Sequence, residues 1–186
     1  MYKSGFTLVE MLVTTAITII LLIGLFNFYY VSKVVYTSGI TRQALQNASG
    51  VVLSKIIQGG KEQPSGGVYR LAQGTRYCIG TGASCGGAVS TAELHYWGPD
   101  NIERWYRLGG ANTSLIYHHP IAGNAAGADE TIYTAPSGAT LTLLFWIPSG
   151  NYPAANAGAS VTLTQIVYGK TFTGSSTTVV NLRNHP

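Results

Sequence analysis

The chain has 186 residues, enough for one domain together with an anchoring segment. Only 10% of its residues are charged, 46% are hydrophobic, and the formal net charge is +4. Because the lysines and arginines form no continuous block, this balance does not demand a nucleic acid partner. Neither the His-Glu-x-x-His motif nor a complete phosphate-binding loop motif occurs, so the sequence predicts no enzyme and no cofactor.

The first element in chain order is an apolar run preceded by a short basic leader. Lys3 and Gly5 come before a hydrophobic stretch that extends from Phe6 to Phe28, in which Glu10 is the only acidic residue. This stretch reaches the about 20 residues that a helix needs to cross a hydrocarbon core. A secretory signal peptide is cut after its apolar segment, whereas the cut expected here lies before it and leaves the segment in the mature protein.

The junction between leader and run resembles a known processing site. Residues 5–10 read Gly-Phe-Thr-Leu-Val-Glu, which closely resembles the motif of type IV prepilins and type II secretion pseudopilins. The resemblance implies that a membrane prepilin peptidase cuts after Gly5, removes the leader of residues 1–5, and methylates the new amine of Phe6. It also implies a cytoplasmic leader, an extracytoplasmic head, and a single-pass membrane protein that enters a cell-surface or periplasmic filament. The implied partners are membrane lipid, other pilin or pseudopilin subunits and an inner-membrane assembly platform.

Glu10 is the residue of this segment that most needs a physical explanation. A charged side chain inside a membrane span costs roughly 2.5–3.5 kcal/mol and usually has a partner. After cleavage the nearest source of positive charge is the amine of Phe6, and N-methylation keeps that charge. We therefore expect the Phe6 amine of a neighbouring subunit to neutralise Glu10 in the filament core, and the family implies the same role for the matching glutamate. The alternative is a carboxylate at the bilayer interface without a special partner.

The pattern after the apolar run is amphipathic and predicts that the helix continues. No proline occurs before Pro64, and Gly59-Gly60 is a helix stop signal. We therefore expect one helix over residues 6–58, with 6–28 in the membrane or filament core and 29–58 packed on the head. The apolar positions that recur at three- and four-residue steps are Leu45, Ala48, Val52 and Ile56.

Two features bear on the type of subunit. Major type IV pilins usually carry a proline near the middle of this helix, whereas this chain has Asn27 in that region. The absence of that proline favours a pseudopilin or a minor pilin. The segment from Tyr96 to Leu108 is also loosely similar to the sheet of J-type minor pseudopilins and of W-type minor pilins.

Residues 59–186 are expected to form a β-rich globular head, which gives an α+β, pilin-like fold with an antiparallel sheet packed on the helix. Gly98-Pro99-Asp100-Asn101 predicts a turn between two antiparallel strands. Inward-facing side chains near this turn are expected among Leu94, Tyr96, Ile102 and Trp105. The predicted strands are Val68–Leu71, Arg76–Ile79, Ala92–Trp97, Ile102–Leu108, Ser114–His118, Thr131–Tyr133, Leu141–Ile147 and Val161–Val167.

The two cysteines, Cys78 and Cys85, are separated by a short glycine-rich loop. An even number of cysteines in an extracytoplasmic protein favours a disulfide. A loop of this kind can bring the two Cα atoms within the ~4.4–6.8 Å that a disulfide requires. A metal site is disfavoured because no cysteine or histidine lies beside them at ligand spacing.

Two further pairs of residues are candidates for metal binding. His118 and His119 are adjacent, so a strand would turn them to opposite faces and keep them from sharing one metal. Histidines in a surface loop are the preferred interpretation. Asp129 and Glu130 offer oxygen ligands for calcium but lack the spacing of an EF-hand loop. The sequence therefore predicts no metal site.

The alternative function is that of a DNA-binding pilin in a DNA-uptake machine. Arginine and aromatic residues together can bind single-stranded nucleic acid through charge and stacking. The same residues are equally expected on the outer face of a sheet, where arginine stems cover aromatic rings. The arginines with aromatic neighbours are Arg70, Arg76, Arg104 and Arg107.

Overall fold

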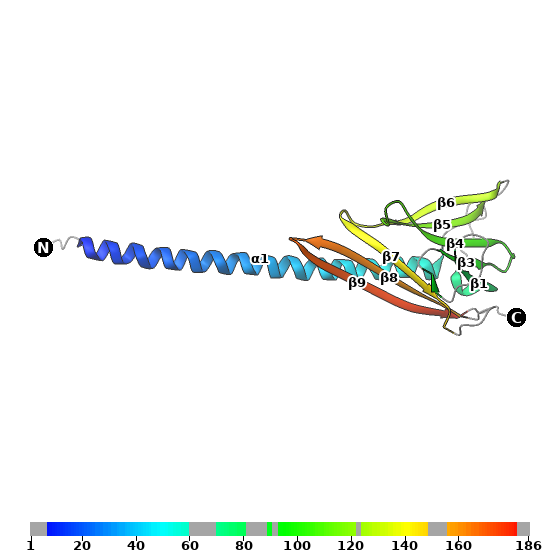
Figure 1. The fold of residues 1–186 in the computed structure, drawn as a ribbon, viewed down its shortest axis with the longest axis horizontal. Helices are drawn as coiled ribbons and strands as arrows, with labels where there is room; N and C mark the ends of the chain where they lie inside the picture. Colours follow the sequence, from blue (N-terminus) through cyan, green and yellow to red (C-terminus); the bar gives the residue numbers. More distant parts are fainter. Residues whose placement is uncertain are drawn as a thin grey trace. The chain divides into compact units, whose positions relative to one another are not determined.

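The computed structural model describes residues 7–59, 70–80, 89–90, 93–121, 124–148 and 156–181. Along this part of the chain, a long α-helix is followed by a short 3₁₀ helix and nine β-strands (Figure 1). The chain divides into two compact units, residues 1–41 and residues 42–186, so the boundary falls within the helix. The elements are α1 (Leu8–Gln58), η1 (Leu71–Gln73), β1 (Arg76–Ile79), β2 (Val89–Ser90), β3 (Glu93–Trp97), β4 (Glu103–Gly109), β5 (Ser114–Ile121), β6 (Asn124–Thr134), β7 (Ala139–Trp146), β8 (Asn156–Val167) and β9 (Lys170–Asn181).

Local signals define both ends of α1. Thr7 precedes the first helical residue, and its side-chain hydroxyl accepts a hydrogen bond from the backbone N–H of Glu10 at 3.3 Å, as an N-cap residue does. At the other end, Gly59 has a φ of 76° and donates its N–H to the carbonyl of Lys55 at 3.1 Å. Because a left-handed glycine closes the last turn of a helix, the predicted stop after Gln58 is confirmed.

The first unit, residues 1–41, contains the most apolar part of α1. The large hydrophobic side chains of its described residues are mostly exposed, from Leu8 to Ile40. A window of this helix has a mean hydropathy of 2.4 and is not buried, so α1 is long and apolar enough to cross a membrane by length and composition. An exposed apolar surface of this size needs lipid or another protein to cover it.

The second unit, residues 42–186, contains two antiparallel sheets together with the end of α1. One sheet has the strand order β1-β3-β4-β5-β6, and the other has the order β2-β7-β8-β9. Within each sheet the strands pair largely with their neighbours along the chain, which is typical of hairpin connections. The predicted α+β, pilin-like arrangement of a long helix and antiparallel strands is therefore confirmed.

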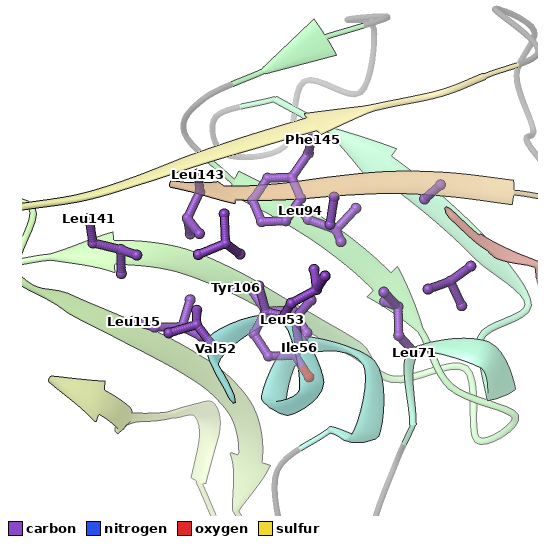
Figure 2. Packing of buried hydrophobic residues seen from close by; sticks show 14 of the residues in the cluster. Val52, Leu53, Ile56, Leu71, Leu94, Tyr106, Leu115, Leu141, Leu143 and Phe145 are labelled. Atoms are coloured by element: carbon purple, nitrogen blue, oxygen red, sulfur yellow. The ribbon is translucent and has the colours of Figure 1, made fainter. Parts of the chain in front are cut away.

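The core of the second unit is formed by side chains from both sheets and from the last turns of α1. Figure 2 shows Phe145 of β7 and Tyr106 of β4 in the same cluster as Val52 and Ile56 of α1. All four side chains are completely buried. The apolar stripe predicted on the helix is thus confirmed as the side that packs into the core of this unit. Its buried hydrophobic members are Leu45, Val52, Leu53 and Ile56.

Most of the predicted strands are present, but the two ends of the head differ from the prediction. Leu71 begins the 3₁₀ helix η1 instead of ending a strand, and residues 68–69 lie outside the described part. Strand β9 (Lys170–Asn181) is present although the sequence pattern did not predict it. Its hairpin with β8 turns at Tyr168 and Gly169, which have φ values of 51° and 72°. Two residues with positive φ form the tight turn that best fits the twist of a hairpin.

Strand β4 turns a different face inward from the one predicted. Trp105 lies on the outer side, and Ile102, just before the strand, is 42% exposed. Arg104 and Tyr106 turn inward instead and are completely buried. The reason is that the Arg104 guanidinium bonds to Asp100 of the preceding turn, so a charged side chain can occupy a core position. The inward positions predicted on β3 are confirmed: they are Leu94 and Tyr96.

Strand β9 lies directly against α1 at Gly174. A Cβ atom at this position would lie 2.5 Å from the backbone nitrogen of Gln46 and closer still to the carbonyl of Leu45. The side-chain amide of Gln46 donates to the carbonyl of Ser175 at 2.8 Å and accepts from its N–H at 3.3 Å. Gln46 of the helix therefore satisfies the backbone hydrogen-bonding groups of Ser175 at the edge of β9. The neighbouring position, Gly174, has room only for glycine.

We expect Gly174→Ala to lower the free energy of unfolding of the head by ~1–3 kcal/mol, because the added methyl group overlaps backbone atoms that cannot move independently. Urea unfolding followed by tryptophan fluorescence measures this, since all three tryptophans lie in the second unit. Gly50→Ala is the matched control. A Cβ there meets only the Ser176 hydroxyl at 3.9 Å, and helix propensity should raise stability by up to ~1 kcal/mol. Equal midpoints for the two variants would contradict the close contact.

Candidate functional site

The start of α1 is where the sequence predicts processing and assembly. Gly5 and Phe6 lie outside the described residues, and Glu10 is exposed in the first turn of the helix. Thr7 and Glu10 have the spacing of a capping box, in which a threonine is followed three residues later by glutamate. A carboxylate in the first turn is also favoured by the helix dipole. Glu10 therefore has a local role in the helix in addition to the predicted role in assembly.

Cys78, the first of the two cysteines, lies on β1 and is 1% exposed. It stands opposite His95 in the register of β1 and β3. Cys85 lies outside the described residues, so the Cys78–Cys85 disulfide stays a prediction. One end of the predicted bridge is therefore a buried side chain on the same face of the sheet as His95.

A second candidate site lies on the outer face of the five-stranded sheet, where polar side chains of neighbouring strands meet. Strand alternation turns these side chains to the face opposite the core. The register sets His95 opposite Trp105, Trp105 opposite His118, and His118 opposite Asp129. The members of this outer-face cluster are Glu93, His95, Glu103, Trp105, Arg107, His118 and Asp129.

Three aromatic rings of the outer-face cluster stack across the strands. The rings of Trp105 and His118 are nearly parallel, with centroids 3.5 Å apart, and the ring of His95 lies 5.3 Å from that of Trp105. Because β3 and β5 flank β4 on opposite sides, both faces of the indole are covered. Trp105 therefore offers no open face on which a nucleobase could stack.

His95 is buried and connects two carboxylates on different strands. Its Nε2 atom lies 2.8 Å from Glu93, and its Nδ1 atom lies 2.9 Å from Glu103. The contact with Glu103 links β3 to β4, whereas the contact with Glu93 lies within β3.

Asp129 lies at the other end of the outer-face cluster, where it also contacts a histidine. It lies 2.7 Å from Nδ1 of His118 and accepts a further hydrogen bond from Arg107. Partial burial acts to raise the pKa of Asp129, but the hydrogen bonds from His118 and Arg107 outweigh it and hold this pKa below its ordinary value. Asp129 is therefore an ionised carboxylate at neutral pH.

The outer-face cluster lines an open depression of about 640 Å³. Its lining contains histidine, carboxylates and arginine, but no serine, threonine, cysteine or lysine among the residues described. The charged and imidazole groups of this lining are hydrogen-bonded to one another, so they hold neighbouring strands together. The sequence contains a signal for this cluster. The patterns Glu-x-His and Glu-x-Trp-x-Arg lie on either side of the predicted turn, and their polar residues fall on one face of the two strands.

Residues 1–26 match the family model of the prokaryotic N-terminal methylation motif. The chain carries this motif. It is typical of type IV prepilin-like proteins, and it covers the leader, Glu10 and the first turns of the exposed apolar helix. The comparisons with curated proteins and with solved structures found no match for the chain. The family match therefore covers the N-terminal segment and does not extend to the head.

The predicted metal candidates have other partners. His118 and His119 lie on strand β5, so their interpretation as surface-loop histidines is wrong. They face opposite sides, where His118 contacts Asp129 and the buried His119 lies 3.8 Å from Glu130. Among the residues placed in the structure, no group of three or more histidine, cysteine, aspartate or glutamate side chains could hold a metal.

The arginines considered for DNA binding lie in different surroundings. Arg104 is completely buried, and Arg107 forms an ion pair with Asp129. The guanidinium of Arg76 lies 4.1 Å from the centre of the Trp97 ring, which is the expected arrangement of an arginine over an aromatic side chain. Arg70 is exposed. The four residues do not form one continuous basic surface.

One short segment matches the whole pattern of a catalytic motif, and another matches part of one. Residues 82–86 read Gly-Ala-Ser-Cys-Gly, and residues 169–171 read Gly-Lys-Thr. A nucleophile elbow needs a strand that turns into a helix, whereas residues 82–86, themselves outside the described part, stand between β1 and β2. A phosphate-binding loop also opens a helix, whereas residues 169–171 belong to the β8–β9 hairpin. The Gly-Lys-Thr segment therefore lacks the structural context of its motif, whereas the structure gives no context for residues 82–86.

The ion pair between the buried Arg104 and the partly exposed Asp100 holds the β3–β4 turn on the head. The two guanidinium nitrogens donate to the two carboxylate oxygens at 2.9 and 2.8 Å. A Cβ at Gly98 would lie 2.7 Å from both side chains, so glycine leaves room for the pair. The hydrogen bond from Arg104 outweighs burial and holds the pKa of Asp100 below its ordinary value.

We expect Asp100→Asn to destabilise the head by on the order of 3 kcal/mol or more at neutral pH, because Arg104 is then a buried charge without its counter-ion. The pKa of Asp100 is lowered in the folded state, so its contribution is present above the unfolded pKa of ~3.9 and lost as pH falls through the folded pKa. The difference between wild type and variant should therefore shrink in acid.

Urea unfolding of both proteins at a series of pH values measures this difference. Asp129→Asn is the matched control, because its pair with Arg107 is about 40% exposed on both sides and should contribute only ~0–1 kcal/mol. An Asp100→Asn variant as stable as Asp129→Asn would show that Arg104 does not depend on its partner.

Proposed function

We propose that the protein is a structural subunit, of the minor pilin or pseudopilin type, of a type IV pilus or a type II secretion pseudopilus. The observation that carries this proposal is a methylation motif followed directly by a helix whose first, most apolar part is exposed. Before assembly this part anchors the subunit in the membrane, with the head on the extracytoplasmic side. After assembly it is covered by the same part of neighbouring subunits.

In this proposal a prepilin peptidase cuts after Gly5, and the methylated amine of Phe6 becomes the first group of the mature subunit. Glu10 pairs with the Phe6 amine of a neighbour and so fixes the register between subunits. The position of Glu10 in the first turn of α1 supports this role, because it stands at the end of the apolar surface nearest the amine. The assembly platform of the inner membrane transfers the subunit from lipid into the filament.

We also propose that Cys78 and Cys85 form a disulfide in the extracytoplasmic head. The burial of Cys78 supports it, because a disulfide whose sulfur is shielded from solvent is less accessible to reducing agents. The bridge would fix the loop that follows β1.

The mature protein purified from its host membrane should begin with N-methyl-Phe6, because the peptidase recognises the small Gly5 before an apolar residue. Intact-mass and N-terminal peptide mass spectrometry measure the cut, the methyl group and, from the loss of two hydrogen atoms, the disulfide. Replacement of Gly5 by a bulky residue is the control and should leave the leader attached. A wild-type protein that keeps residues 1–5, or is cut after the apolar run, would overturn the proposal.

Glu10→Ala should leave cleavage and membrane insertion intact but prevent efficient entry into filaments. In the membrane, loss of a carboxylate near the helix end costs little. In the filament, it leaves the Phe6 amine of a neighbour buried without its counter-ion, at a cost of ~3–5 kcal/mol. Cleavage, membrane fraction and sheared-filament fraction are measured in parallel.

Glu10→Gln and Glu10→Asp are the matched variants. Gln has nearly the same size without the charge and should fail as Ala does, whereas Asp keeps the charge and should retain part of the assembly. Normal filament entry of the Ala and Gln variants would show that Glu10 does not set the register.

A further inference from the structure

The outer face of strands β7, β8 and β9 differs in composition from the rest of the head. The three strands lie side by side in one sheet (Figure 1), and their buried and exposed positions alternate, so every second residue points away from the core. The outward positions are mostly hydroxyl side chains. They are Thr140, Thr142, Leu144, Trp146, Asn156, Gly158, Ser160, Thr162, Thr164, Ile166, Thr171, Thr173, Ser175, Thr177, Val179 and Asn181.

The register aligns these hydroxyls in rows across the sheet. One row is Thr140, Thr164 and Thr173, and the next is Thr142, Thr162 and Ser175. In a third row the hydroxyls of Ser160 and Thr177 are 3.0 Å apart. Rows of this kind repeat about every 6.6–6.8 Å along a strand and about every 4.7–4.9 Å across the sheet. Since a hydroxyl both donates and accepts hydrogen bonds, the face matches a ligand that presents many hydroxyls itself.

Trp146 lies at one end of this face, directly above Gly158 of the neighbouring strand. The two residues are cross-strand partners, and the central atoms of the indole occupy the space that a Cβ at Gly158 would take, with Cδ2 at 2.5 Å. An indole that rests on the backbone with one face turns its other face away from the sheet. Leu144 and Val179 beside it are 37% and 50% exposed. Trp146 is half-buried and, among the residues that the structure describes, is not part of a ring stack, unlike Trp105 in its stack of histidines.

The same face contains no ionisable side chain among its described positions. Charges of the head gather instead on the outer face of the other sheet, in the outer-face cluster. Exposed strands normally carry charges that prevent sheets from associating, and threonine's preference for strands does not explain why they are missing here. A neutral hydroxyl face with one tryptophan excludes a nucleic acid or a charged lipid surface as the ligand, because both need cations.

We propose that the outer face of β7, β8 and β9 binds the surface of an uncharged polysaccharide. The apolar face of a sugar ring would lie on the side of Trp146 that is turned away from Gly158, which removes apolar surface from water on both partners. Thr142, Ser160 and Thr177 would exchange hydrogen bonds with the hydroxyls of that and the adjoining sugar. The proposal does not depend on which filament the subunit enters.

The test is co-sedimentation of the full chain with microcrystalline cellulose and with chitin, in a zwitterionic detergent without sugar groups. Wild-type protein should pellet with at least one of these polymers, and high salt should not release it, because no charges take part. Thr162→Lys places a charge in the middle of the face and should weaken binding by on the order of tenfold or more. Trp146→Ala should do the same, whereas Trp146→Tyr should keep part of the binding.

Thr131→Lys on β6 is the matched control, because it adds the same charge at an exposed strand position of the other sheet. It should bind as wild type does. Tryptophan fluorescence and urea unfolding show which variants are folded, and Thr162→Lys keeps all three tryptophans. Absence of wild-type binding to both polymers, or equal loss in Thr131→Lys and Thr162→Lys, would overturn the proposal. So would sedimentation of wild type alone that Thr162→Lys abolishes, since the face would then be a contact between copies of the chain.

Discussion

The apolar surface of α1 has to be covered, and its two parts meet this requirement differently. In the second unit, Val52 and Ile56 are completely buried by side chains of the same unit. In the first unit, apolar side chains from Leu8 to Tyr36 are exposed. At ~25 cal/mol per Å² of apolar surface, this exposure is too costly to persist in water. The same helix therefore contributes to the fold through its second part and requires lipid or other subunits for its first part.

The role of Glu10 can be judged from the free energies that act on a carboxylate at the start of the helix. A carboxylate in the first turn gains ~0.3–1 kcal/mol from the helix dipole, and about 2 kcal/mol in favourable, partly buried sites. Its cost inside a membrane span is roughly 2.5–3.5 kcal/mol. The helix dipole therefore offsets part of this cost but not all of it. The proposed pairing of Glu10 with the Phe6 amine of a neighbouring subunit would supply the positive partner that the carboxylate lacks in an apolar filament core.

Elements whose formation depends on local chemistry could be predicted from the sequence. The stop at Gly59, the strand Arg76–Ile79 and the turn at Gly98–Asn101 follow from residue type alone. The face of β4 could not be predicted in this way, because Arg104 is buried only through its pair with Asp100, and an arginine read by itself indicates an exposed position. Similarly, β9 is rich in threonine and serine and has few large apolar residues, so only its pairing with β8 and its contact with α1 define it.

The two sheets of the head share one core but present opposite chemistry outward. The outer face of the five-stranded sheet carries carboxylates, histidines and arginine that bond mainly to one another, so its polar groups are largely satisfied within the chain. The outer face of β7, β8 and β9 carries hydroxyls, several of them at exposed positions, together with the half-buried indole of Trp146. Groups that are already paired gain little from a ligand, whereas exposed hydroxyls gain from one that replaces their water. The uncharged face is therefore the better candidate for recognition, even though the charged face contains a depression.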